Sequence, residues 1–205
     1  VTPFDEEGRV DYEKAKSLAN ALLDSGSDGV VVSGTTGESP TLTTEEKLRL
    51  FAEVKGSVGD RGAVIAGTGS YNTAESIHLS REAQALGVDG LLLVVPYYNR
   101  PTPEGLYQHF KAIAESVALP CILSNVPSRT ALNRPAETTV RLGQDDNIVG
   151  LKEAVGDLDQ VAEIVERAEE GFRVWSGDDK DTLHVLAAGG YGVVSVASHL
   201  VGAQI

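Results

Sequence analysis

A lysine that follows a short apolar stretch is the residue of this sequence with the clearest chemical potential. Residues 148–151 read Ile-Val-Gly-Leu, and Lys152 comes directly after them. A continuous apolar run is typical of a strand that is buried on both faces. Burial lowers the pKa of a lysine and leaves its amine free to attack a carbonyl carbon. Most lysines at strand ends extend to water and have no such role, so this stretch alone does not decide.

Other polar side chains also follow apolar runs. They are Thr35, Thr36, Tyr97, Tyr98, Ser124, Arg129 and the segment 176–179, Ser-Gly-Asp-Asp. In a barrel of parallel strands the carboxyl ends of all strands meet at one rim, where catalytic residues gather. The sequence therefore predicts that Lys152 shares a site with hydroxyls, phenols and a guanidinium.

The elements that would position these residues alternate along the whole chain. Expected strands are 28–33, 63–66, 90–95, 121–124, 148–152, 172–176 and 192–196. Expected helices are 11–23, 45–54, 73–86, 103–117, 136–142, 158–168 and 180–188. The alternation predicts an α/β fold with a parallel sheet. If Val1–Phe4 is the tail of a further strand, about eight strands favour a closed (β/α)8 TIM barrel over an open doubly wound sheet.

Composition limits the class of protein. The 205 residues contain no linker-like segment, so we expect one TIM-barrel domain over 1–205. A net charge of -13 argues against nucleic acid as a partner. No apolar stretch is long enough for a membrane span, and the single Cys121 suits a reducing, cytoplasmic compartment. The chain contains no Met and stops where a helix is expected to begin, so we expect a barrel truncated at both ends.

No motif predicts a cofactor or a metal. The segment 67–72, Gly-Thr-Gly-Ser-Tyr-Asn, lacks the third glycine of a dinucleotide-binding turn. The four histidines do not pair with Cys, Asp or Glu at the spacing of metal ligands. Asp178 and Asp179 are interpreted as the start of a helix, where carboxylates suit the free N–H groups.

Four motifs along the chain resemble the signatures of the dihydrodipicolinate synthase family, whose members are class I aldolases that use pyruvate. They are 34–39 (GTTGES), 96–101 (PYYNRP), 125–130 (NVPSRT) and 150–154 (GLKEA). The resemblance implies that Lys152 forms an imine with pyruvate and that the derived enamine attacks aspartate semialdehyde. The implied product is 4-hydroxy-tetrahydrodipicolinate, in lysine (diaminopimelate) biosynthesis. It further implies a cytoplasmic lyase without a cofactor that assembles as a homotetramer.

The same resemblance implies roles for individual residues. Thr35 and Thr36 would grip the pyruvate carboxylate, and Thr35 would begin a proton relay. Tyr98 would extend that relay into the site of a neighbouring subunit, and Arg129 would bind the carboxylate of the aldehyde. Substrate-binding positions are also implied for Gly177 and Val194.

The sequence departs from the family pattern at Ser124, where a tyrosine is expected before Asn125. That tyrosine would be the central phenol of the relay. Serine keeps a hydroxyl but is several ångströms shorter, so it cannot occupy the same point, although an ordered water could bridge the gap. We therefore expect an impaired synthase, an engineered variant or a relative with an altered substrate.

Feedback inhibition by lysine is a trait of many family members. Glu75 and Tyr97 stand where the resemblance places the effector, with Ser39 nearby. The neighbouring positions differ from the lysine-sensitive pattern, and these are Pro40, Thr44, Lys47 and Tyr71. The sequence predicts weak or absent inhibition by lysine.

Two alternatives remain open at this point. A sister aldolase, such as an N-acetylneuraminate or 2-keto-3-deoxy sugar acid lyase, would use the same lysine. Arg129 favours the synthase, because a sugar has no carboxylate at that end. The other alternative is a relative without catalytic activity that is kept for binding or assembly.

Overall fold

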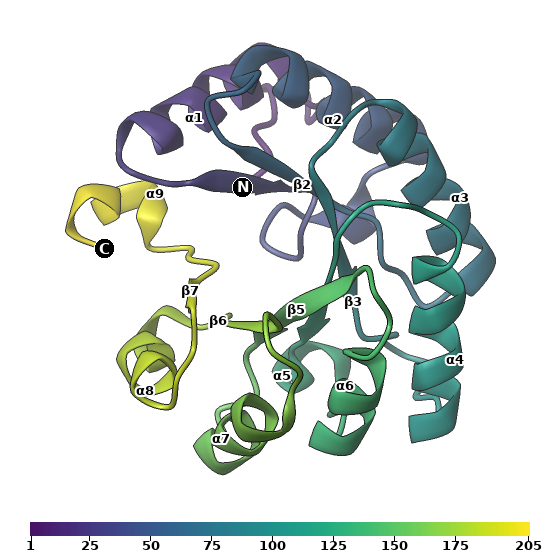
Figure 1. The fold of residues 1–205 in the computed structure, drawn as a ribbon. Coiled ribbons are helices and arrows are strands. Elements are labelled where there is room, and N and C mark those ends of the chain that lie inside the picture. The colour runs from purple at the N-terminus through teal and green to yellow at the C-terminus, as the bar shows by residue number, and fades with distance from the viewer.

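The computed structural model describes residues 1–205 and is built around a sheet of seven parallel strands that follow one another in chain order (Figure 1). The strands are β1 (Gly29–Val32), β2 (Ala63–Gly67), β3 (Gly90–Val94), β4 (Cys121–Asn125), β5 (Ile148–Glu153), β6 (Arg173–Ser176) and β7 (Gly192–Val193). The helices are α1 (Tyr12–Asp24), α2 (Thr44–Val58), α3 (Thr73–Ala85), α4 (Pro103–Ala114), α5 (Pro127–Thr130), α6 (Ala136–Leu142), α7 (Leu158–Arg167), α8 (Thr182–Ala187) and α9 (Ser198–Val201). The sheet curves, and the longer helices lie along its outside (Figure 1). The predicted α/β barrel arrangement is confirmed.

Local sequence fixes where the helices begin. The Asp11 carboxylate accepts a hydrogen bond from the backbone of Lys14 and caps α1. Thr43 and Glu46 form the expected capping box of α2, in which each side chain accepts from the other residue's backbone N–H. These caps explain why the predicted starts of the helices agree closely with the structure. None of the helices combines the length and the apolar character that crossing a lipid bilayer requires.

The core lies between the outer face of the sheet and the helices. Leu91, Leu93 and Leu123 are 0 % exposed and point to this side of β3 and β4. They belong to one cluster with Phe51 of α2 and Phe110 of α4, which are equally buried. Because successive side chains of a strand alternate between faces, this packing turns every other residue toward the inside of the barrel.

The register of the sheet places the chemically interesting residues on that inner face. Val94 of β3 pairs with Ser124 of β4, and Ser124 pairs with Lys152 of β5. Lys152 in turn pairs with Trp175 of β6. Ser124 and Lys152 are thus direct neighbours, and the strand-end positions that the sequence singled out meet at one edge of the sheet.

The described residues form seven of the expected barrel strands, and the sheet is not closed between its two ends. The strand order runs from β1 to β7 without a pairing between these two, and Figure 1 shows them apart. The expected strand tail Val1–Phe4 makes only one isolated antiparallel bridge, between Phe4 and Val10. Pro3 has no N–H to donate to a ladder, and the Thr2 hydroxyl bonds instead to the carbonyl oxygen of Gly37.

Several element boundaries also differ from expectation, among them the ends of α2 at Val58 and of α4 at Ala114. Strand β5 continues past Lys152 to Glu153, so the lysine is the penultimate residue of the strand. The expected strand at 192–196 ends after Val193, and the expected helix at 180–188 begins at Thr182 after a single 3₁₀ turn. The Asp179 carboxylate in that turn binds the chain after β7, accepting hydrogen bonds from Ser195, Val196 and Ala197.

Candidate active site

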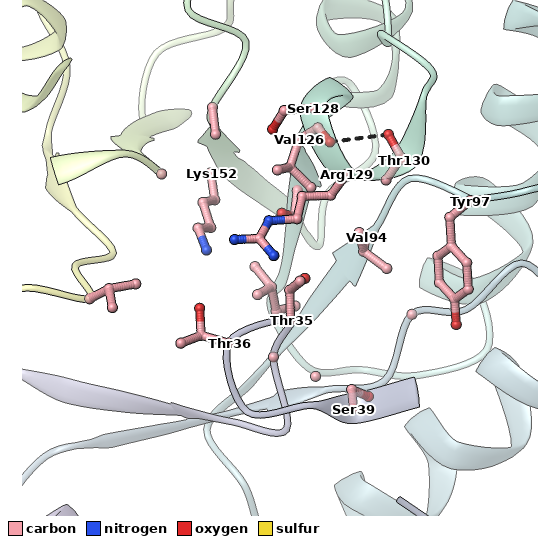
Figure 2. Close-up of a pocket in the computed structure, with 18 of the residues that line it drawn as sticks. Thr35, Thr36, Ser39, Val94, Tyr97, Val126, Ser128, Arg129, Thr130 and Lys152 are labelled. Atoms are coloured by element: carbon pink, nitrogen blue, oxygen red, sulfur yellow. Dashed lines mark hydrogen bonds between the residues drawn. The ribbon is translucent and has the colours of Figure 1, made fainter. Parts of the chain in front are cut away.

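A cavity of about 480 Å³ opens at the carboxyl ends of the strands (Figure 2). Segments from all seven strand ends line it: 33–36 and 39–40 after β1, Gly67 and Gly69 at the end of β2, Leu92, Val94 and Tyr97 around the end of β3, Ser124 of β4 with Val126 and 128–130 after it, Lys152 and Ala154 at the end of β5, 177–179 after β6, and Val196 after β7. Its size is in the range of small-molecule sites. The cavity joins most of the residues that sequence analysis identified separately.

The amine of Lys152 extends into this cavity (Figure 2). Burial lowers the pKa of Lys152, the negative charge of Asp179 raises it, and the positive charge of Arg129 lowers it, with a net decrease. The amine makes no hydrogen bond and no salt bridge within the chain. A larger share of the amine is therefore neutral near pH 7 than for a lysine in water, and its lone pair is free to attack a carbonyl.

Gly177 leaves the space that the lysine side chain occupies. A Cβ at position 177 would lie 3.0 Å from Cε of Lys152 and 3.1 Å from its Cγ. The backbone of Gly177 donates a hydrogen bond of 2.7 Å to the carbonyl oxygen of Glu153, which holds the two segments together. Any larger residue would push the lysine side chain, so the predicted role of Gly177 in the site has a steric basis.

The loop after β1 presents four hydrogen-bond donors that have no partner within the chain. Thr35 and Thr36 lie opposite Lys152 in Figure 2, and their hydroxyls make no hydrogen bond. Their backbone N–H groups are also unpaired. The hydrogen bonds that close the turn use other donors: the N–H of Glu38 donates to the carbonyl oxygen of Thr35, and the N–H of Ser39 donates to that of Gly34. Free N–H groups and hydroxyls beside a glycine suit a small carboxylate.

Arg129 lies on the other side of the cavity, on the one-turn helix α5 (Figure 2). The Thr130 hydroxyl fixes this turn by donating to the carbonyl oxygens of Val126 at 3.2 Å and Leu132 at 2.9 Å. The guanidinium of Arg129 makes no hydrogen bond or salt bridge and points toward the amine of Lys152. Its planar fork is available for two hydrogen bonds to a ligand carboxylate.

Ser124 lines the cavity beside Lys152, and its side chain leaves the centre of the site without a phenol. The residue is 4 % exposed, and its hydroxyl has no hydrogen-bond partner. A serine Oγ lies close to the sheet, so it cannot extend to the amine of Lys152 across the strand pair as a longer side chain would. The residue beside Lys152 on β4 therefore offers a short hydroxyl and no phenol.

Two predicted positions are not brought into this cavity. Tyr98 is 91 % exposed, and its backbone has a φ of 75°, a conformation that is strained for a tyrosine. Its neighbour Tyr97 does line the cavity and packs edge to face on Tyr71, with ring centroids 5.1 Å apart. Val194 lines a second cavity of about 750 Å³ between β7 and β1, which Lys152 also borders.

Sequence analysis missed the role of Asp179. We expected only a helix start, and Asp178 does cap the 3₁₀ turn by accepting from the backbone of Lys180. The Asp179 carboxylate instead accepts hydrogen bonds from the chain after β7, and its charge acts on Lys152. The side chains that make these contacts are 16 or more residues apart, so no local pattern could have identified them.

A buried polar network lies behind the lysine, on the outer face of the sheet. Glu153 is 3 % exposed and accepts hydrogen bonds from the Asn125 amide at 2.9 and 3.1 Å and from Gln160 at 3.4 Å. Burial raises the pKa of Glu153 to about 7, against the opposing effect of the positive charge of Arg134. Arg134 is itself fully buried, and its two terminal nitrogens have no partner. This network ties the ends of β4 and β5 to the segment before α6.

Replacing Glu153 with glutamine is expected to remove a pH dependence of stability. The pKa in the folded state, about 7, lies above the ordinary value of 4.5, so the folded state binds more protons between these values. The free energy of unfolding then falls as pH rises through this window, by on the order of 3 kcal/mol for this one group. Urea unfolding at about pH 5 and pH 8 should show a smaller fall for Glu153→Gln than for the unchanged protein. Glu137→Gln, which removes an exposed carboxylate from α6, is the control, and equal falls in all three proteins would contradict the prediction.

Comparison with known proteins agrees with this geometry. The family model of the dihydrodipicolinate synthetase (DHDPS) family matches residues 1–205. A 4-hydroxy-tetrahydrodipicolinate synthase of Dehalococcoides mccartyi is 62% identical over 205 residues, which are 100% of this chain and 69% of that protein. A crystal structure of a dihydrodipicolinate synthase from Bacillus anthracis has a TM-score of 0.98 and 52% identity, and the match covers 100% of this chain and 70% of that one. A DHDPS from Cyanidioschyzon merolae with lysine bound gives a TM-score of 0.98 and 49% identity over the same shares.

The match extends over the full chain and includes the segments that line the cavity around Lys152. The identity to the curated relative is far above the level at which a fold alone would be shared. The chain therefore belongs to the dihydrodipicolinate synthetase family.

Proposed function

We propose that this protein condenses pyruvate with aspartate semialdehyde to 4-hydroxy-tetrahydrodipicolinate, as a Schiff-base lyase of lysine (diaminopimelate) biosynthesis. The observation that carries the proposal is the unpaired amine of Lys152, which faces four free donors of Thr35 and Thr36 inside one cavity. The relative from Dehalococcoides mccartyi is named as a synthase of this product, which supports the assignment. We place the protein in the cytoplasm, as the family resemblance implies.

The first half of the reaction uses the lysine and the threonine loop. Thr35 and Thr36 hold the pyruvate carboxylate with their backbone N–H groups and hydroxyls, which places the keto carbon at the amine of Lys152. The amine bonds to that carbon, and the keto oxygen leaves as water. The resulting iminium draws electrons from the methyl group, so the methyl loses a proton and an enamine forms. No cofactor enters these steps, because the iminium itself stabilises the charge.

The second half needs a second carboxylate site and a proton donor. Arg129 binds the carboxylate of aspartate semialdehyde with its unpaired guanidinium, so the aldehyde carbon lies near the enamine. The new alkoxide takes a proton from a relay in which Thr35 and Ser124 take part, the latter through a bridging water. The amino group that came with aspartate semialdehyde then attacks the iminium carbon and displaces the amine of Lys152, which closes the ring and frees the lysine.

Tyr98 completes the relay from another copy of the chain. Its phenol is almost fully exposed and lies outside the cavity of its own chain, on a strained loop that holds it away from the barrel. A side chain presented in this way is available to the site of a neighbouring subunit. We therefore propose a homo-oligomer, and specifically a homotetramer by analogy with the family.

A coupled assay tests the proposed function. Pyruvate and aspartate semialdehyde are supplied together, and the product is reduced by the next enzyme of a dihydrodipicolinate pathway with loss of nicotinamide absorbance. Turnover that requires both substrates supports the proposal. Cleavage of N-acetylneuraminate or of a 2-keto-3-deoxy sugar acid, without condensation of aspartate semialdehyde, would instead identify a sister aldolase.

Free L-lysine is expected to change the rate of condensation by less than about fivefold at millimolar concentration, which is the lower end of usual allosteric coupling. Lys47 is half-buried, and the carboxylate of Glu75 acts on its ammonium, so a cation already faces the group that an effector amine would need. Initial rates are measured as L-lysine hydrochloride is raised, with potassium chloride as the ionic-strength control. A steep loss of rate with lysine alone would show that an effector site is functional.

A further inference from the structure

Asp179 connects the candidate site to the chain after β7. Its Oδ1 accepts a hydrogen bond from the hydroxyl of Ser195, and its Oδ2 accepts from the backbone N–H groups of Val196 at 3.0 Å and Ala197 at 2.9 Å. The Ser195 hydroxyl also accepts from the backbone of Ser198 at 2.9 Å. One carboxylate therefore turns a segment 16–18 residues further along the chain, which borders the cavity at Val196.

The same carboxylate carries the negative charge that acts on the lysine. Burial raises the pKa of Asp179. The hydrogen bonds from Ser195, Ala197 and Val196, together with the positive charge of Lys152, outweigh this effect, so the pKa is lowered overall. Asp179 is therefore ionised at neutral pH. It raises the pKa of Lys152 against the larger effect of burial, while Arg129 lowers it. Lys152, Asp179 and Arg129 all line the same cavity.

Asp178 provides a contrast. Its carboxylate accepts from the backbone of Lys180 and pairs with the Lys180 ammonium at 3.4 Å, and both side chains are largely exposed. No effect of Asp178 on Lys152 is found among the causes of the lysine's shift. Both carboxylates line the cavity, but Asp178 pairs with Lys180, whereas Asp179 is bound by the chain after β7.

Imine formation creates a positive charge on the Lys152 nitrogen that the negative charge of Asp179 would stabilise. The neutral amine of Lys152 bonds to the keto carbon of pyruvate, one proton is taken up, and the keto oxygen leaves as water. The nitrogen then carries a fixed positive charge as an iminium. A fixed anion close to that nitrogen stabilises the iminium without reorganisation of solvent.

We propose that Asp179 is a positioning residue that supplies the counter-charge for the iminium on Lys152 and holds segment 195–197 at the rim of the site. This inference rests on the proposed function, because it requires that Lys152 forms an imine. It assigns to Asp179 a role in the first chemical step, whereas Arg129 acts on the second substrate.

The test is the pH dependence of pyruvate trapping. The full chain is incubated with pyruvate and sodium borohydride between about pH 6 and pH 10, and the rate of adduct formation is followed by mass spectrometry. In Asp179→Asn the pH of half-maximal trapping is expected to fall by about one unit, because an opposing charge no longer favours the ammonium form. The maximal trapping rate is expected to fall about tenfold, since the iminium loses the same stabilisation.

Three further variants separate charge from structure. Ser195→Ala keeps the carboxylate but weakens the loop, so its pH midpoint should equal that of the unchanged protein. Asp179→Glu restores the charge and should restore the midpoint. Asp178→Asn, the matched control, should also leave the midpoint unchanged.

The role of Asp179 would be overturned if the midpoint did not shift in Asp179→Asn, or if it shifted equally in Asp178→Asn or Ser195→Ala. In that case an adduct on Lys152 would still support the proposed function. The absence of any adduct in the unchanged protein would overturn both.

Discussion

Ser124→Tyr is expected to raise the turnover of pyruvate and aspartate semialdehyde by about 10²–10⁴-fold, the usual contribution of a positioned proton donor. Ser124 is the direct neighbour of Lys152 in the sheet register, on the inner face, with no partner for its hydroxyl. A tyrosine there places a phenol where the carbinolamine and the alkoxide develop their charge. The cavity of about 480 Å³ provides room for the ring beside a three-carbon substrate.

The variant Ser124→Phe distinguishes the effect of the tyrosine hydroxyl from the effect of the aromatic ring. The phenylalanine fills the same space without a hydroxyl, so it should not exceed the turnover of the unchanged protein. Steady-state rates of the three proteins are compared at saturating concentrations of both substrates. Equal turnover in all three would show that no donor is missing at this position, and a gain in Ser124→Phe equal to that in Ser124→Tyr would assign the effect to packing.

Lys152→Met is expected to lower the rate of condensation by at least about 10³-fold, because a covalent path loses its nucleophile altogether. Methionine has a similar shape and an apolar end, so it fits a position where burial already opposes the charged form of the lysine. The fold should therefore be kept or stabilised, and loss of activity can be read as loss of chemistry. Circular dichroism and urea unfolding verify this.

Lys180→Met is the matched control for this variant. Lys180 lies near the same rim, but its side chain is 73% exposed and pairs only with Asp178. Its replacement should leave the condensation rate within about twofold, as for most exposed positions. If Lys152→Met kept most of its activity, the reaction could not proceed through an imine on this residue.

Much of the fold could be predicted from the sequence because the signals are local. The capping residues Asp11 and Thr43 mark helix starts by contacts within three residues, and apolar runs such as Gly90–Val94 mark buried strands. The convergence of Lys152 with Thr35 and Arg129 also followed, because parallel strands bring their carboxyl ends together. These inferences need only periodicity and chain order.

The features that could not be predicted depend on contacts between residues that are far apart in the sequence. Strand β7 ends at Val193, and the backbone N–H groups of Val196 and Ala197 after it donate to the Asp179 carboxylate. No residue near position 193 indicates this distant contact. The segment Val1–Phe4 is a similar case, since it has the composition of a strand end but pairs with no strand of the sheet. The burial of Glu153 and Arg134 could not be predicted either, because glutamate and arginine side chains are usually exposed.

Borohydride trapping with pyruvate alone tests the central claim most directly, because it needs neither the second substrate nor the proton relay. The protein is incubated with pyruvate, reduced, digested and analysed by mass spectrometry. The account predicts one reduced pyruvate unit per chain, located on Lys152 and absent from Lys152→Met. No adduct, or an adduct on a different lysine, would contradict it.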